Sequence, residues 1–141
     1  KAGITNDEMV QNLDFAQTFL EAAGIDAPND MQGESLIPLL TESGKDWTRD
    51  AVYYHYYEYP SVHMVKRHYG IVNKDYKLVR FYYDVDEWEL YDRKNDPNEM
   101  NNVYNDPEYS DIVSDLKIQL AELRKKYKDS EELDQKFIYK N

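Results

Sequence analysis

Two stretches of this chain decide its fold: Tyr69-Gly-Ile-Val-Asn-Lys-Asp-Tyr-Lys-Leu-Val-Arg-Phe81 and Trp88-Glu-Leu-Tyr-Asp-Arg-Lys-Asn-Asp-Pro-Asn-Glu-Met-Asn-Asn102. The first contains two runs of strand-favouring residues, and Asn73-Lys74-Asp75 between them is typical of a tight turn. The second begins with a similar run and continues into a polar loop, where Asp96-Pro97 indicates a turn. Strands joined by short loops lie antiparallel. The pattern therefore predicts neighbouring strands at 67–73, 76–83 and 87–91.

A further strand is predicted just upstream, at 51–58, where the sequence reads Ala-Val-Tyr-Tyr-His-Tyr-Tyr-Glu. Aromatic and β-branched residues of this kind favour strands. Side chains alternate between the two faces of a strand, so 76–83 places Leu78 on one face and Val79 on the other. Neither face of that strand is purely polar. We therefore expect both sides of the sheet to be covered in part.

Two helices are expected outside the strands. Thr5 to Glu8 fits a capping box, apolar residues follow at helical spacing, and Gly24 is a natural stop, which predicts a helix over 6–23. Asp106-Pro107 is an N-cap signal followed by a long apolar stripe and terminal cations, which predicts a helix over 107–128. Between the first helix and the strands, 25–50 reads as a connector, in which Ser35 caps a short helical turn. Residues 129–141 read as a polar tail.

The predicted fold class is α+β: a four-stranded antiparallel sheet with a long C-terminal helix, plus an N-terminal helix. The length of 141 residues fits one domain or a subdomain. With 28 acidic and 17 basic residues, the net charge of −11 repels nucleic acid and anionic membrane, so neither is expected as a partner. There is no cysteine, hence no disulfide and no thiolate metal site. No apolar run reaches the roughly 18 residues that a membrane span needs.

Four segments, taken in order, resemble one family. Val10 to Ile25 resembles "V-x-x-x-D-x-x-P-T-x-L-x-x-A-G", and the segment 28–40 resembles "P-x-x-x-x-G-x-S-L-x-P-L-L". Tyr76 to Val79 and Trp88 to Asn102 resemble "Y-K-L-(I/V)" and "W-E-L-Y-D-L-x-x-D-P-x-E-x-x-N". These are motifs of the C-terminal part of type I, formylglycine-dependent sulfatases of the alkaline phosphatase superfamily, N-sulfoglucosamine sulfohydrolases among them. The resemblance covers about residues 5–128, with Gln17 standing where the family usually has Pro.

The resemblance implies that 1–45 is the last helix and connector of a large catalytic domain, and that 46–128 is the sulfatase C-terminal subdomain. It also implies that calcium and formylglycine belong to the parent enzyme, which hydrolyses sulfate esters of glycans such as glycosaminoglycan sugars and is periplasmic or secreted. No C/S-x-P/A-x-R motif, from which formylglycine is made, occurs here. This chain alone is therefore expected to hold no cofactor, no metal and no catalytic residue, and to be inactive.

The implied partners are the N-terminal catalytic domain and a sulfated carbohydrate. Without that domain, the wide apolar face of the helix 6–23 has no cover, and exposed apolar patches are uncommon in stable monomers. We therefore expect self-association through the first helix, or repacking of this helix onto the sheet.

The one basic cluster lies between two predicted strands, at His63, Lys66, Arg67 and His68. In related glycan sulfatases, loops of the small subdomain reach the sugar, and a guanidinium can grip sulfate oxygens. His63, Arg67 and His68 are therefore the predicted substrate-binding residues. The alternative is a solvated loop whose cations protect a strand edge.

Other residues favour structural roles. His55, in the middle of a tyrosine-rich strand, is interpreted as a hydrogen-bonded structural histidine rather than a ligand. The tyrosines at 53, 54, 56, 57 and 59 are interpreted as packing residues in preference to surfaces that stack on sugar rings. The acidic run from Asp84 fails the calcium-loop pattern, because Trp88 and Glu89 stand where a ligand and a glycine are needed. Asp96 and Glu99 are interpreted as residues that fix their own loop.

Two other functions remain open from the sequence. One is a free-standing carbohydrate- or protein-binding module with a tyrosine-rich binding face, although such a module has little reason to carry so apolar a first helix. The other is a related phosphoesterase of the alkaline phosphatase superfamily, whose distinguishing motif would lie N-terminal to these residues.

Overall fold

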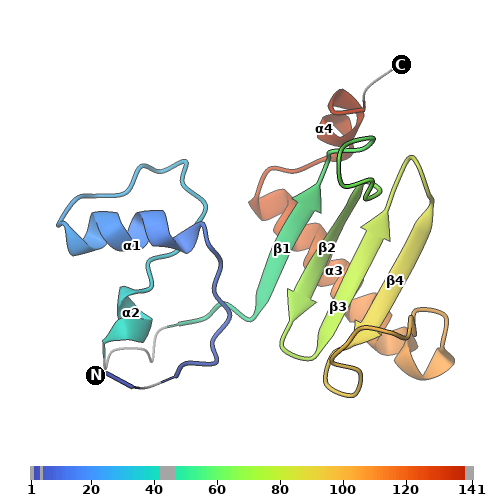
Figure 1. Cartoon of the computed structure of the whole chain (residues 1–141), viewed down its shortest axis with the longest axis horizontal. Coiled ribbons are helices and arrows are strands. Elements are labelled where there is room, and N and C mark those ends of the chain that lie inside the picture. Colours follow the sequence, from blue (N-terminus) through green and yellow to red (C-terminus); the bar gives the residue numbers. More distant parts are fainter. Residues whose placement is uncertain (1, 4, 42–46, 139–141) are drawn as a thin grey trace. The chain divides into compact units, whose positions relative to one another are not determined.

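The computed structural model describes residues 2–3, 5–41 and 47–138 and divides into two compact units, 1–52 and 53–141 (Figure 1). The expected boundary between a large-domain part and the C-terminal subdomain, at 45/46, stays a prediction. Assignment of the first unit to the large domain of a sulfatase stays a prediction.

Within its described residues, the first unit contains two helices, α1 at Asp14–Ala22 and α2 at Ile37–Leu40. The prediction of a helix from residue 6 is wrong, because residues 5–13 are not helical. Asn6 accepts a hydrogen bond from the Glu8 backbone N–H at 2.9 Å, so a local turn replaces the expected capping box. The helix begins instead where the Asp14 carboxylate accepts from the backbone N–H of Gln11 at 2.6 Å.

Two other expected signals of this unit, the stop at Gly24 and the cap at Ser35, are confirmed. Gly24 has φ +69° and its N–H bonds to the Glu21 carbonyl, while the Ile25 N–H bonds to the Leu20 carbonyl. This pair of bonds is a Schellman motif, which needs a residue in the left-handed region. At α2, the Ser35 hydroxyl accepts from the Ile37 N–H at 3.2 Å, and Pro38 occupies the first turn.

A buried ion pair ties the first unit together. The Arg49 guanidinium grips Asp14 with two bonds of 2.5 and 2.8 Å, and Asp14 is fully buried. Asp14 also accepts from the Glu34 N–H at 2.9 Å. The Thr18 hydroxyl accepts from the Leu36 N–H at 2.8 Å. Polar bonds from α1 therefore hold the connector that follows it.

The second unit is built on a sheet of β1 (Ala51–Tyr56), β2 (His68–Asn73), β3 (Tyr76–Phe81) and β4 (Glu87–Asp92). The strands lie in chain order, and β2, β3 and β4 pair antiparallel. All four predicted strands are confirmed. Ile71, Leu78 and Leu90 stand opposite one another across the three strands, and each has no exposed surface. Val79, on the other face of β3, is also buried, as expected for a sheet covered in part on both sides.

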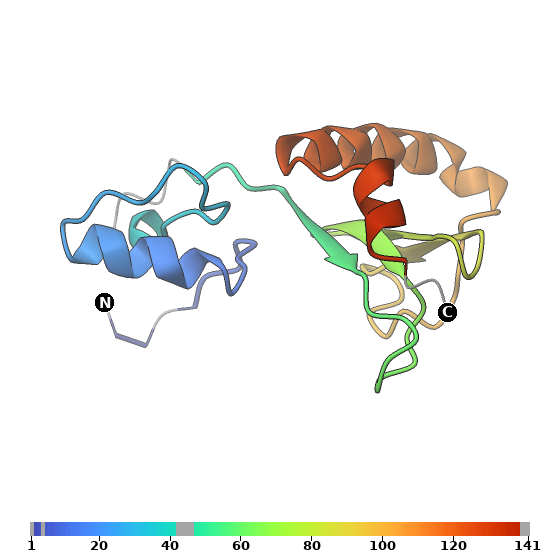
Figure 2. The same ribbon diagram turned by 90° about the horizontal axis from the view of Figure 1, so that it is seen from above.

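The predicted helix over 107–128 is confirmed as a 3-10 turn, Pro107–Tyr109, continuing into α3, Ser110–Lys126. Asp106 accepts from the Glu108 N–H, as an N-cap should. α3 lies along one face of the sheet (Figure 2), and its Leu116 and Leu120 are each 2% exposed. Apolar burial between this stripe and the Ile71–Leu90 row forms the core of the unit.

The expectation of a polar tail over 129–141 is wrong for residues 129–138. A short helix, α4 (Glu131–Lys136), begins at Ser130, whose hydroxyl accepts from the Leu133 N–H. Asp134 and Ile138 are buried. The rest of that predicted tail lies outside the described residues.

Across the described parts of the chain, no helix combines the length and the apolar character needed to cross a membrane.

Replacing Arg49 with Met leaves Asp14 charged, buried and without its guanidinium. We expect the free energy of unfolding of the first unit to fall by about 3 kcal/mol, because an uncompensated buried charge is costly. Urea titration of the whole protein, followed by hydrogen exchange in 14–40, measures this. Glu34→Gln is the control: Glu34 lies 3.6 Å from the same guanidinium with 38% of its side chain exposed, and its loss should cost less than about 1 kcal/mol.

The same pair predicts an acid-sensitive unit. Burial works to raise the pKa of Asp14, but hydrogen bonds from Arg49 and from the backbone of Glu34 and Gln11 outweigh it and hold the pKa below its ordinary value. This stabilisation is present at neutral pH and is lost as the pH falls through the lowered pKa. An Arg49→Met protein as stable as the original, with the same acid profile, would contradict the account.

Candidate functional site

Three residues of the basic cluster, His63, Lys66 and Arg67, lie in the segment 57–67, which joins β1 to β2 and is called here the β1–β2 loop. Its tip is exposed: Val62 is 91% and Met64 63% accessible, and His63 between them is also exposed. Met64 has a left-handed φ of 52°. For a residue other than glycine this backbone conformation costs about 1 kcal/mol of conformational energy. The loop therefore presents an imidazole and two apolar side chains to its surroundings.

Arg67 lies at the base of this loop and points inward. It is 1% exposed, its Nη1 donates to Asp84 at 2.7 Å, and its Nη2 donates to the Tyr59 carbonyl. The guanidinium carbon lies 5.7 Å from the Tyr59 ring and 5.6 Å from the Tyr83 ring, within the range of cation–π attraction. Arg67 thus ties the start of the loop to the segment that follows β3.

The other two residues of the basic cluster, Lys66 and His68, are held separately. The Lys66 ammonium lies 3.8 Å above the Tyr59 ring and donates to its hydroxyl. His68 begins β2, where Nδ1 donates to the Lys66 carbonyl at 2.7 Å and the ring packs beside Tyr56 and Phe81. The structure therefore does not bring the cluster together on one surface. His63 points outward, while Arg67 and His68 make contacts at the base of the loop. Substrate contact by His63, Arg67 and His68 stays a prediction.

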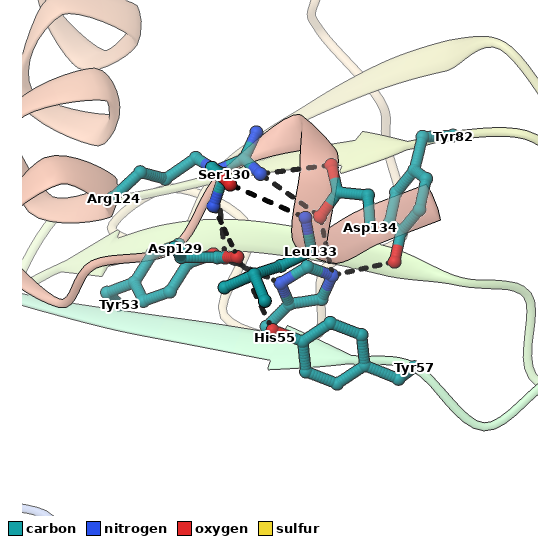
Figure 3. A network of polar contacts seen from close by, with 9 residues as sticks. All are labelled: Tyr53, His55, Tyr57, Tyr82, Arg124, Asp129, Ser130, Leu133 and Asp134. Atoms are coloured by element: carbon teal, nitrogen blue, oxygen red, sulfur yellow. Dashed lines mark hydrogen bonds and ion pairs between the residues drawn. The ribbon is translucent and has the colours of Figure 1, made fainter. Parts of the chain in front are cut away.

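Sequence reasoning missed a second polar cluster, which Figure 3 shows between β1 and α4. Asp129 accepts from His55 Nδ1 at 2.7 Å, from the Tyr53 hydroxyl, and from the Ser130 N–H at 2.8 Å. Asp134 accepts from Arg124 at 3.0 and 3.1 Å. The cluster was missed because both carboxylates lie in the segment read as a tail. Ser130 followed by two glutamates is a helix-start signal that could have revealed it.

His55 is hydrogen-bonded on both ring nitrogens, in line with its structural interpretation. A carboxylate only accepts, so Nδ1 carries a proton toward Asp129, and Nε2 accepts from the Tyr82 hydroxyl at 2.7 Å. Burial lowers the pKa of His55 against the opposing pull of Asp129 and Asp134. Burial also works to raise the pKa of Asp129, but bonds from Tyr53 and His55 hold it below its ordinary value. A neutral imidazole beside an ionised carboxylate results.

His55, Asp129 and Asp134 also have the composition of a metal site, since one donor atom of each lies within 4.8 Å of the others. Arg124 argues against an ion there. Its Nη2 bonds both oxygens of Asp134, and its Nε lies 3.6 Å from Asp129. The guanidinium already supplies the positive charge that the two carboxylates need. The cluster is therefore best read as a closed polar network.

The acidic residues near β4 are held by backbone N–H groups of their own loop or by basic side chains of other segments. Asp96 accepts from the backbone N–H of Met100 at 2.7 Å and of Asn101 at 2.8 Å. Glu99 pairs with Lys77 at 2.5 Å and Arg93 at 3.3 Å. Asp84 and Asp86 pair with Arg67 and Arg80. Each carboxylate has a protein partner, in agreement with the structural interpretation of Asp96 and Glu99.

Asp84→Asn should destabilise the second unit by about 3 kcal/mol, because Arg67 then remains buried without its counter-charge. Chemical denaturation of the whole protein measures the change. Asp86→Asn is a matched control in the same turn: its side chain is 85% exposed, and loss of that surface pair should cost less than about 1 kcal/mol. Equal effects of the two substitutions would show that the Arg67 pair carries no special weight.

Comparison with known proteins identifies the family to which this chain is similar. Residues 1–126 match the family model described as N-sulphoglucosamine sulphohydrolase, C-terminal. An N-acetylglucosamine-6-O-sulfatase of Bacteroides thetaiotaomicron is 53% identical over 134 residues, which are 93% of this chain and 24% of that protein. The chain thus spans about a quarter of the length of this relative.

Solved structures agree. A protein in complex with its substrate D-glucosamine-2-N,6-O-disulfate superposes with a TM-score of 0.79 and 54% identity, covering 84% of this chain and 24% of that one. A 2-O glycosaminoglycan sulfatase superposes with a TM-score of 0.72 and 29% identity, covering 82% of this chain and 25% of that one. The order of the strands and the long helix match the sulfatase C-terminal subdomain. The chain therefore belongs to the C-terminal family of N-sulphoglucosamine sulphohydrolases and is the C-terminal subdomain of a sulfatase.

Proposed function

We propose that the protein containing this chain hydrolyses sulfate esters of glucosamine-bearing glycans, glycosaminoglycan sugars among them. The observation that carries the proposal is the 53% identity over 134 residues to an N-acetylglucosamine-6-O-sulfatase. The likeness to a structure holding a disulfated glucosamine supports the same sugar. A free-standing binding module is not favoured, since the match extends through both units of the chain.

In this proposal the reaction centre lies outside residues 1–141. The chain has no cysteine and no C/S-x-P/A-x-R motif from which formylglycine could be made. Among the described residues, the one cluster with metal-ligand composition is closed by Arg124. Formylglycine and a calcium ion would be held by the catalytic domain, where they supply the nucleophile and the stabilisation of charge on the sulfate. The 141 residues alone should release no sulfate.

The contribution proposed for this chain is substrate binding by the β1–β2 loop. His63 is exposed at its tip, and an imidazole can donate a hydrogen bond to a sulfate or carboxylate oxygen of the sugar. Arg67 and the Tyr59 carbonyl hold the base of the loop. Direct contact by Arg67 or His68 would require these side chains to exchange their present partners for the substrate.

Sulfate release by the complete protein tests the activity. We expect inorganic sulfate from N-acetylglucosamine-6-sulfate and no phosphate from the matching phosphate ester. Release of phosphate alone would overturn the proposal in favour of a phosphoesterase.

His63→Ala in the complete protein should raise KM about tenfold, which corresponds to about 1.4 kcal/mol, and leave kcat nearly unchanged. The reason is that the imidazole contacts bound sugar rather than the reacting atoms. Steady-state kinetics on the 6-sulfated sugar provide the measurement. Val62→Ala, at a neighbouring position that is 91% exposed and has no polar group, should change KM by less than about twofold. An unchanged KM in His63→Ala would contradict the proposal that the loop contacts the substrate.

The proposed partner of the first unit is the catalytic domain, which would cover the apolar side of α1. On this helix Phe19 is 70% and Phe15 53% exposed, and their rings stack with centroids 6.4 Å apart. Such a patch is unusual on the surface of a stable monomer. The exposed fractions support an interface on this side of the helix.

The 141 residues by themselves should therefore self-associate through α1. Light scattering should give a mass above the 16.8 kDa of one chain, and replacing Phe15 and Phe19 together with Ser should return it to one chain. Replacing Ile118, which is 60% exposed in the other unit, with Ser is the control and should leave the mass high. A monomer at the outset would contradict this part of the proposal.

A further inference from the structure

Asp129, just before α4, accepts hydrogen bonds from side chains at the end of β1. Besides His55 and Tyr53, it approaches the Tyr57 hydroxyl at 3.4 Å. The imidazole of His55 stacks on the Tyr57 ring with centroids 3.7 Å apart, and Phe137 packs 4.9 Å from that ring on its way out of α4. Tyr57 is the first residue of the β1–β2 loop. One side of the loop's base is therefore held by the segment that begins at Asp129.

The same network reaches the other side of the base through Tyr82. Its hydroxyl bonds His55 Nε2 at 2.7 Å, and Tyr82 is 8% exposed. The next two residues along the chain are Tyr83 and Asp84, which hold the Arg67 guanidinium. The backbone N–H of Tyr82 in turn donates to the Arg67 carbonyl. Contacts therefore run without a break from Asp129 through His55 and Tyr82 to Arg67.

Arg124 keeps this network in one arrangement. It pairs with Asp134 and Asp129, and its guanidinium carbon lies 3.9 Å above the Tyr69 ring of β2. The side chains of Arg124, Asp129 and Asp134 are 12%, 6% and 6% exposed, so water screens their charges poorly. A hydrogen bond in such surroundings is strong, and removing one partner leaves the other polar group unpaired at a high cost.

We propose that Asp129 is a positioning residue, which braces the β1–β2 loop through His55, Tyr57 and Tyr82 and so sets the affinity for a sulfated sugar without touching it. Figures 1 and 3 place α4 and the end of β1 beside each other. The sugar-binding part of this inference rests on the function proposed above, whereas the bracing of the loop stands on the contacts alone. In this proposal the short segment after α3 braces the loop, a role that its polar sequence does not indicate.

Asp129→Asn in the complete protein tests the inference. The amide keeps the size of the side chain but loses the charge. Its NH2 group replaces one carboxylate oxygen, and this group donates at a position where Tyr53 and His55 also donate, so one of these hydrogen bonds is lost. We expect backbone hydrogen exchange in 57–67 to accelerate about tenfold, because the loop opens more often. Exchange in α3 around Leu116 and Leu120 should stay the same. KM for the 6-sulfated sugar should rise about threefold to tenfold, with kcat nearly unchanged.

Glu131→Gln is the matched control, since it removes one negative charge two residues away on an exposed position of α4. It should leave loop exchange and KM as they are. Tyr53→Phe is a milder second variant, which deletes one donor to Asp129 and should produce a smaller change in the same direction.

The outcomes separate the two levels of the proposal. Unchanged exchange in 57–67 of both Asp129→Asn and Tyr53→Phe overturns the brace, whatever the kinetics. Faster loop exchange with unchanged KM supports the brace and overturns the role of the loop in binding. Equal acceleration throughout the second unit overturns the inference, because Asp129 would then support the whole fold and not the loop.

Discussion

A charge buried in a protein must be paired, and this requirement shapes the parts of the chain that hydrophobic packing does not. Asp14, Arg67 and Asp134 are all almost fully buried, and each meets an opposite charge from a distant segment. Leaving any one of them alone would cost several kcal/mol. Each pair therefore fixes where a connector, a loop or a short helix must lie. The apolar core between α3 and the sheet supplies most of the stability, but it leaves these segments undetermined.

Two arginines of the second unit, Arg67 and Arg124, hold different parts of it. Arg67 closes the base of the β1–β2 loop against Asp84 and the Tyr59 carbonyl. Arg124 joins α3 to α4 through Asp134 and covers the Tyr69 ring. The tyrosines between them pack their rings against neighbours and donate hydroxyl hydrogen bonds, as Tyr82 does to His55. A rigid base allows an exposed tip, with His63, to keep one position while it meets a ligand.

The strands and the long helix could be predicted from the sequence, because alternation and helical spacing report directly on burial. The opposite faces of Leu78 and Val79 and the stripe on α3 follow from those periods alone. The start of α1 could not be predicted, because Thr5 to Glu8 has the local pattern of a cap. Long-range bonds from Arg49 and Glu34 to Asp14 place the first turn elsewhere. α4 was missed for a related reason: it has little apolar periodicity, and its position depends on charges from α3 and β1. Arg67 illustrates the same limit, since a basic residue in a loop gives no sign in the sequence that its partner is Asp84.

The most direct test of the account is a crystal structure of the complete protein with glucosamine-6-sulfate bound. We predict the β1–β2 loop at the rim of the pocket that holds the sugar, with the His63 imidazole within hydrogen-bond distance of a sugar or sulfate oxygen and Arg67 still paired with Asp84. A sugar bound far from this loop, or a loop whose base has come apart to release Arg67, would contradict the account.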